Sequence, residues 1–304
     1  MSLSNSLPKS VNIVEVGPRD GLQNEPSVSL EAKIELIDRL SHSGLTHIES
    51  GAFVSETKVP QMASSGDVFK QISRQKHVTY SALTPNVQGL EAAIECGVDQ
   101  VAVFTSASEG FCQRNINCSI SQSLDRFSDV IELASKHQLP VRGYLSCIVD
   151  CPYDGPTAPT QVRDVTRAML DMGCYEVSLG DTVGTGTPNK IADVLDTILT
   201  QSDTLELAAH FHDTYGQGLA NLYQALLMGV STIDSSVAGL GGCPYAKGAA
   251  GNVATEDVIY LCHGMGIGTG LKLNHIVDTA WFICHLLNKL PRSKVALTMP
   301  PQTF

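Results

Sequence analysis

Leu205-Glu206-Leu207-Ala208-Ala209-His210-Phe211-His212-Asp213 is a largely apolar run that ends in two histidines one residue apart, and an amphipathic stretch follows at 216–228. The run predicts a β-strand over 205–211. Side chains two positions apart on a strand project from the same face, so His210 and His212 point the same way. This strand-then-helix unit decides the fold, because it recurs along the chain.

Eight such units follow one another in the sequence. Strands are predicted at 11–16, 45–50, 77–83, 98–104, 140–147, 174–179, 205–211 and 232–237. Helices are predicted at 30–43, 60–72, 86–96 (with Asn86 as N-cap), 119–136, 159–172, 188–200 and 216–228, with further helices at 253–265 and 271–290. The strands are too apolar to have a wet face, which indicates a parallel sheet covered by helices.

Eight units are the number that closes a barrel, so we expect an α/β protein with a (β/α)8 TIM barrel and additional C-terminal helices. A doubly wound open sheet is the alternative, but the first loop has no Gly-x-Gly-x-x-Gly turn. No shift in composition marks a second domain. Residues 1–304 are therefore predicted to form a single barrel domain, with a short polar lead-in at 1–10 and an extra helix at 271–290.

Composition excludes several classes of protein. The chain has 20 basic and 31 acidic residues, a net charge of −11 that argues against a nucleic-acid-binding surface. No apolar run is long enough to cross a bilayer, and residues 1–10 are too short for a signal or transit peptide. We expect a soluble, cytoplasmic protein.

The nine cysteines are an odd number without paired zinc spacing, and most are expected to be buried thiols of a reducing compartment. Cys243 is the exception, because it lies in a segment, 239–251, that contains five glycines. Such a loop can open and close over a substrate. A thiol there can exchange a proton in the site, and we expect its oxidation to inactivate the protein reversibly.

In a barrel of this kind, functional residues lie in the loops after the strand C-termini. Asp20, His210, His212 and Asn252 all fall in such loops or strand ends, and together they offer one carboxylate, two imidazoles and one amide oxygen. This donor set predicts a divalent metal site, and its share of oxygen favours Mg²⁺ or Mn²⁺. The alternatives are a turn-forming Asp20, an Asn252 that caps the helix after it, and ordinary polar histidines at a strand end.

Arg19, next to Asp20, is the best candidate for stabilising negative charge on a substrate oxygen, because its guanidinium is always protonated and offers a planar fork of donors. The alternative is a structural ion pair with Glu49 or Asp181. Glu49 lies at the end of the second predicted strand and Asp181 just after the sixth, so both are expected at the same end of the barrel.

With these residues in place, the sequence resembles the 3-hydroxy-3-methylglutaryl-CoA lyase family over nearly its whole length. The resemblance rests on four stretches, which are Val14–Glu25, Ser178–Thr182, His210–Gln217 and Val237–Tyr245. It implies a divalent ion held by Asp20, His210, His212 and Asn252, and catalytic and substrate-binding roles for Arg19 and Cys243. Gln23 and Ser178, inside these stretches, are expected to bind substrate.

The resemblance also implies a reaction. The substrate's tertiary hydroxyl loses its proton, the C2–C3 bond breaks, and acetoacetate and the enolate of acetyl-CoA form, as in leucine degradation and ketone-body chemistry. Arg19 fits the stabilisation of the enolate, and Cys243 or His212 the return of a proton. The general base is left open among Asp20, Asp181, Glu49 and His212.

The family resemblance further implies an acyl-CoA partner, held in part by the C-terminal stretch 287–292, and a homodimer. The absence of a leader and of a C-terminal peroxisomal tripeptide fits a bacterial-type, cytoplasmic member. Three rival functions are a lyase for a different 3-hydroxyacyl-CoA, a Claisen-type acyl-CoA synthase of the same superfamily, and a catalytically silent barrel that only binds.

Overall fold

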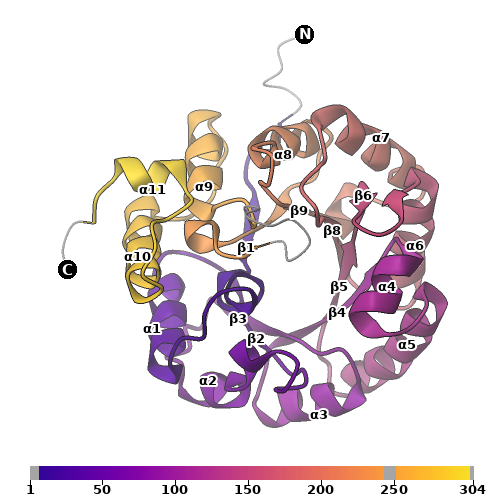
Figure 1. Cartoon of the computed structure of the whole chain (residues 1–304), viewed down its shortest axis with the longest axis horizontal. Helices are drawn as coiled ribbons and strands as arrows, with labels where there is room; N and C mark the ends of the chain where they lie inside the picture. The colour runs from indigo at the N-terminus through magenta and orange to yellow at the C-terminus, as the bar shows by residue number, and fades with distance from the viewer. Residues whose placement is uncertain (1–6, 243–250, 302–304) are drawn as a thin grey trace.

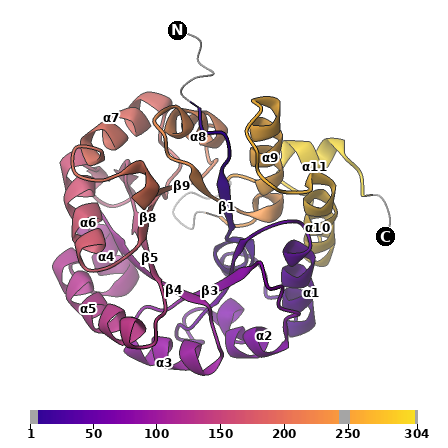
Figure 2. The ribbon, with the colours of Figure 1, turned by 180° about the vertical axis from the view of Figure 1, so that it is seen from behind.

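A closed barrel of parallel strands forms the centre of the computed structural model, which describes residues 7–242 and 251–301. The strand order around the barrel is β1-β10-β9-β8-β5-β4-β3-β2, which confirms the predicted (β/α)8 fold. Figures 1 and 2 show the barrel from its two ends, with helices around it. The strands are β1 Asn12–Glu15, β2 His47–Ala52, β3 Thr79–Leu83, β4 Gln100–Ser106, β5 Val141–Ser146, β8 Glu176–Asp181, β9 Leu207–Phe211 and β10 Thr232–Ser235.

The outer layer follows the predicted helices closely. Its members are α1 Leu30–Ser41, α2 Ser65–Gln71, α3 Val87–Glu95, α5 Ile120–Lys136, α6 Pro159–Asp171, α7 Pro188–Ile198 and α8 Gly218–Leu227. Asn86 caps α3, as predicted, because its side chain accepts a hydrogen bond from the Gly89 amide. The chain then adds α9 Thr255–Gly264, α10 Leu273–Leu286 and α11 Lys294–Thr298. Of these three helices, α10 lies beside α1, and α9 and α11 pack next to α10 (Figure 1).

Three local features differ from the prediction. The helix expected at 60–72 is broken into a 3-10 turn, Pro60–Met62, and α2, because the Ser65 hydroxyl donates to the Met62 carbonyl and accepts from the Ala52 amide. A short helix, α4 Glu109–Ile116, occupies the expected loop after β4. A small hairpin, β6 Asp150–Cys151 with β7 Gly155–Pro156, follows β5.

Apolar side chains fill the space between the strands and the helices, whereas several charged side chains lie among the strands themselves. The strand register brings these charges together. Arg142 on β5 lies opposite Glu176 on β8, and Asp234 on β10 lies opposite His210 on β9. Arg142, Glu176 and Asp234 are all buried, so their charges depend on each other rather than on water.

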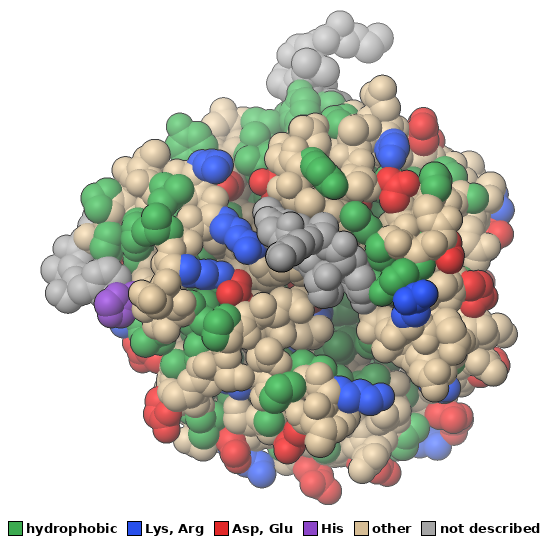
Figure 3. All heavy atoms as spheres, viewed as in Figure 1, with side chains coloured by type: hydrophobic (Ala, Val, Ile, Leu, Met, Phe, Trp, Pro, Cys, Tyr) green, Lys and Arg blue, Asp and Glu red, His purple; other side chains and the backbone are tan. Residues whose placement is uncertain are grey.

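No described helix combines the length and the apolar character that a membrane span requires. On the face drawn in Figure 3, the basic and acidic side chains of the described residues are interspersed and form no broad basic patch. That distribution agrees with the net charge of −11.

Candidate functional site

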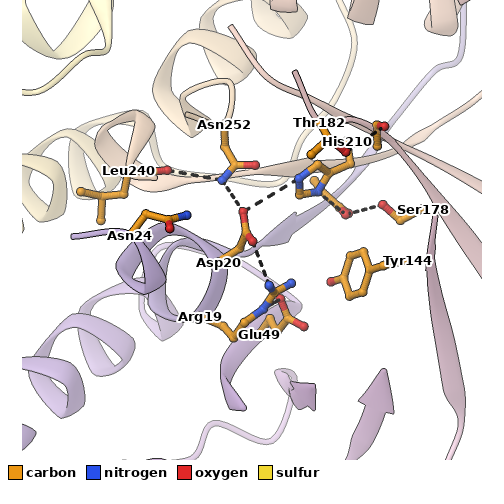
Figure 4. Close-up of polar contacts among 12 residues, drawn as sticks. Arg19, Asp20, Asn24, Glu49, Tyr144, Ser178, Thr182, His210, Leu240 and Asn252 are labelled. Atoms are coloured by element: carbon orange, nitrogen blue, oxygen red, sulfur yellow. Dashed lines mark hydrogen bonds and ion pairs between the residues drawn. The ribbon is translucent and has the colours of Figure 1, made fainter. Parts of the chain in front are cut away.

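The first loop of the barrel forms a single turn of π-helix, Gly17–Gly21, which carries Arg19 and Asp20. Turns of π-helix are rare in proteins as a whole, but those that occur are often found at functional sites. Gly17 permits this turn, because a Cβ there would come within 2.5 Å of Glu15 Oε1. Asp20 is bound on one side by Arg19 Nη1, 2.8 Å from Oδ1, and on the other by Asn252 Nδ2, 2.8 Å from Oδ2 (Figure 4).

Backbone pairing holds Asn252 next to His212. The two residues form an antiparallel bridge just beyond β9, with hydrogen bonds from the Asp213 amide to the Gly251 carbonyl and from the Val253 amide to the Phe211 carbonyl. Asn252 does not cap the following helix, which begins after Ala254, so the capping alternative is wrong. Its amide nitrogen instead contacts Asp20 and the Leu240 carbonyl.

Asp20, His210 and His212 each place a ligand atom within 4.8 Å of the other two. His210 Nε2 is 3.9 Å from Asp20 Oδ2. Two buried atoms beside this group, His212 Nδ1 and Asn252 Oδ1, have no hydrogen-bond partner. A buried polar atom without a partner costs free energy, so a cation that accepts these lone pairs would remove that cost.

The charge states of this group suit a cation. Burial opposes the charge of Asp20, but Arg19 and the two histidines outweigh it and lower its pKa to about 2. Burial and the neighbouring His210 lower the pKa of His212 to about 4, so its ring is neutral. Burial alone would lower the pKa of His210, but the carboxylates of Asp234 and Asp20 together have the larger effect, and the net shift of the pKa is upward. The electrostatic field at this position therefore favours positive charge.

Arg19 is buried and fixed from three sides. Its Nε donates to Glu49 Oε2 over 2.6 Å, it pairs with Asp20, and its Cζ lies 5.3 Å from the ring centroid of Tyr144. The other Glu49 oxygen, Oε1, is buried and has no partner, and burial raises the Glu49 pKa despite the attraction of Arg19. The predicted ion pair with Glu49 is therefore present, and it leaves a carboxylate oxygen free beside Asp20.

The other predicted site residues occupy different positions. Asp181 does not pair with Arg19. Its carboxylate accepts from the amides of Gly184 and Gly186, and burial raises its pKa to about 6. Ser178 points into the barrel and donates to Asp234, and Gln23 lies half-buried just after the π-helix. Cys243 lies outside the described residues.

We call the first group of side chains the mouth cluster: Arg19, Asp20, Glu49, His210, His212 and Asn252. A second group, the interior cluster, lies deeper among the strands and consists of Arg142, Tyr144, Glu176, Ser178 and Asp234. Of the interior cluster, only Ser178 was among the residues predicted from the sequence; Arg142, Tyr144, Glu176 and Asp234 were not. Charged residues within predicted apolar strands were the available signal.

The chain is similar to known proteins over almost its full length. The HMGL-like family model matches residues 10–283. A Pseudomonas aeruginosa protein named 3-hydroxy-3-isohexenylglutaryl-CoA/hydroxy-methylglutaryl-CoA lyase is 56% identical over 292 residues, which are 96% of this chain and 97% of that protein. The human mitochondrial hydroxymethylglutaryl-CoA lyase is 52% identical over 96% of this chain and 90% of that protein.

Solved structures agree. The hydroxymethylglutaryl-CoA lyase of Pseudomonas aeruginosa superposes with a TM-score of 0.95 at 55% identity, covering 97% of this chain and 98% of that one. An HMG-CoA lyase of Acinetobacter baumannii in complex with coenzyme A and 3-methylmalate superposes with a TM-score of 0.91 at 31% identity, covering 97% of each. With the barrel and the mouth cluster in place, these matches identify the chain as a member of the HMGL-like family.

Proposed function

We propose that this protein is a metal-dependent carbon–carbon lyase that cleaves 3-hydroxy-3-methylglutaryl-CoA into acetyl-CoA and acetoacetate. The observation that carries the proposal is the convergence of Asp20, His210 and His212 beside the buried Arg19. The chain is also 56% identical to a Pseudomonas aeruginosa protein whose name includes hydroxy-methylglutaryl-CoA lyase. Leucine degradation is the metabolic role that this activity suggests.

The residues present fit a divalent metal ion. Asp20 is ionised, His212 is neutral, and Asn252 Oδ1 has no other partner. We propose Asp20, His210, His212 and Asn252 as its ligands, with Mg²⁺ or Mn²⁺ favoured by the oxygen share. When bound, the ion would supply Lewis acidity that makes the tertiary hydroxyl of the substrate easier to deprotonate.

We assign removal of the hydroxyl proton to Glu49 and stabilisation of the enolate to Arg19. Of the four candidate bases, Glu49 combines a free buried oxygen with a raised pKa, whereas both oxygens of Asp181 accept hydrogen bonds from backbone amides.

In the proposed reaction, the base accepts the hydroxyl proton, and the C2–C3 bond breaks as the ketone forms. The electron pair moves into the thioester enolate, whose charge Arg19 stabilises. Cys243 is proposed to return a proton to C2 and Gln23 to contact the substrate, whereas His212, as a neutral proposed metal ligand, is poorly suited to donate a proton.

Coenzyme A is proposed to bind near the C-terminal stretch 287–292. A cavity of about 440 Å³ lies there, lined in part by Trp281, His285, Asn288 and Lys289. Lys289 pairs with Glu25, whose carboxylate also accepts from the Gly241 amide, so this stretch is connected to the loop after β10. The Acinetobacter baumannii relative, in complex with coenzyme A, supports an acyl-CoA partner.

One alternative substrate has specific support. The name of the Pseudomonas aeruginosa relative includes a 3-isohexenylglutaryl thioester, so a longer substituent at C3 is a second candidate. A homodimer and a cytoplasmic location stay predictions from the family resemblance.

The direct test is to incubate the purified protein and Mg²⁺ with each thioester and to quantify both products. We expect acetyl-CoA and acetoacetate in equal amounts from the 3-methyl substrate. Turnover of the isohexenyl thioester alone would favour the second candidate. Absence of turnover with both thioesters, in folded protein supplied with Mg²⁺ or Mn²⁺, would contradict the proposal.

A further inference from the structure

Asp234 joins the two clusters. It lies on β10 directly opposite His210 on β9, and its side chain is completely buried. Its Oδ2 is 3.1 Å from His210 Nδ1. No water is needed to connect the interior of the barrel to this histidine.

The carboxylate of Asp234 is itself firmly held. Arg142 donates to both of its oxygens, from Nη2 to Oδ1 over 2.8 Å and from Nη1 to Oδ2 over 3.1 Å. The Ser178 hydroxyl donates to Oδ2 over 2.7 Å. A bidentate arginine fixes the plane of a carboxylate and keeps it ionised. An ionised carboxylate can only accept, so the hydrogen in its contact with His210 belongs to Nδ1.

This assignment determines the other nitrogen of the ring. With the proton on Nδ1, the lone pair of the neutral imidazole is on Nε2, which faces Asp20 Oδ2 at 3.9 Å. A histidine whose second nitrogen donates to a carboxylate is fixed in both tautomer and ring orientation, and becomes a better ligand. Asp234 is completely buried and is not among the proposed metal ligands, so it would act through His210.

We propose that Asp234 is a positioning residue that holds His210 in the Nδ1–H tautomer with Nε2 directed at the metal, and that Arg142 and Ser178 hold Asp234 in place for this purpose. The inference rests on the proposed function, because that function requires the metal. The competing account is that Asp234 only neutralises Arg142. In that case its loss would lower stability without changing metal affinity.

Mn²⁺ titration of the substrate-free protein, followed by electron paramagnetic resonance, separates the two accounts. Asp234→Asn removes the negative charge, and Asp234→Ala also removes the acceptor. We expect Mn²⁺ affinity to fall roughly 10-fold for the first and towards 100-fold for the second, the range found for such outer-shell partners. Glu176→Gln is the matched control. It weakens the other ion pair of Arg142, at 2.7 Å, without touching His210, so affinity should not change.

The same substitution in a His210→Ala background gives a sharper test. If Asp234 acts through His210, Asp234→Asn should cause no further loss of Mn²⁺ affinity there. Wild-type affinity in folded Asp234→Asn, or an equal loss in Glu176→Gln, would overturn the inference while the proposed function stands. A wild-type protein that binds no divalent ion would contradict both.

Nitrogen-15 spectra of histidine in the metal-free wild type provide a readout that needs no foldable Asp234 variant. At alkaline pH, the His210 signals, assigned by their absence in His210→Ala, should show the proton on Nδ1. A neutral His210 with its proton on Nε2 would overturn the inference.

Discussion

The mouth cluster and the interior cluster are both buried and charged, yet their bonding differs. In the interior cluster Arg142 spans Glu176 and Asp234, and no fully buried polar side-chain atom of this group lacks a partner in the described structure. In the mouth cluster Glu49 Oε1, His212 Nδ1 and Asn252 Oδ1 have none. Of the two clusters in the described part of the chain, only the one proposed to bind a ligand therefore contains fully buried polar side-chain atoms without a partner, and the other consists of charges that satisfy each other.

The largest expected effect is on stability and belongs to the interior cluster. Arg142→Met would leave Asp234 and Glu176 buried without their cation. Breaking a buried ion pair by removing one partner costs about 3–5 kcal/mol. Chemical denaturation should show a loss of this size. A loss close to zero would mean that the interior charges are not the support that we infer.

Arg19→Met should show the opposite pattern, with a large loss of rate in a folded protein. Removing a donor that stabilises an oxyanion costs about 2.7–4 kcal/mol, or roughly 10²–10³ in kcat. Arg19→Lys keeps the charge but not the planar fork, so we expect partial rescue. Arg39→Met, at an exposed arginine of α1, is the control and should keep full activity.

Steady-state kinetics and Mn²⁺ titration of these variants provide the measurement. A folded, metal-binding Arg19→Met protein with kcat within a few-fold of wild type would show that the enolate charge is stabilised elsewhere. Loss of metal binding together with loss of stability would instead favour the structural role of the Arg19–Glu49 pair.

Glu15 offers a third, pH-dependent comparison, because it is buried among dipoles rather than cations. It accepts from the amides of Gly17 and Val237 and from the Thr255 hydroxyl, yet burial raises its pKa from 4.5 to about 7. A carboxyl whose pKa is raised on folding contributes stability below its unfolded pKa and loses it as pH rises through the folded value.

Wild-type stability should therefore carry a Glu15 contribution that disappears between about pH 4.5 and pH 7, on the order of 3 kcal/mol. Glu15→Gln keeps an oxygen acceptor for both amides and can donate its Nε2 to the Thr255 hydroxyl, all without the charge. Its unfolding free energy should therefore lack this part of the decline. Parallel pH profiles of the two proteins would show that Glu15 is ionised at no such cost.

The smallest expected effect concerns one unsatisfied atom. Asn252→Ala removes Oδ1 and also the bond from Nδ2 to Asp20. We expect Mn²⁺ affinity to fall at least roughly 10-fold, the lower end of the loss caused by removing an outer-shell partner, because the variant loses both a proposed ligand and a partner of Asp20. Asn24→Ala, which removes a contact to the Gly242 carbonyl in the same region, is the matched control. Equal affinities in both variants would exclude Asn252 from the metal site.

The sequence predicted the barrel because eight units share one pattern, and it predicted the mouth cluster because loops after parallel strands converge at one end. It could not separate Glu49 from Asp181, since both are acids at or just after the C-terminal ends of predicted strands. Only the folded chain shows that Asp181 binds the amides of Gly184 and Gly186. Asp234 was also missed, because the register that places it opposite His210 depends on the closed barrel.

The central claim is that the unsatisfied atoms of the mouth cluster bind a divalent ion on which carbon–carbon cleavage depends. The most direct test strips the protein with chelator, restores Mn²⁺ in steps, and measures bound metal and acetoacetate release on the same samples. We predict negligible turnover without metal and a rate that rises in proportion to occupancy of a single site. Full turnover by the stripped protein would contradict the account.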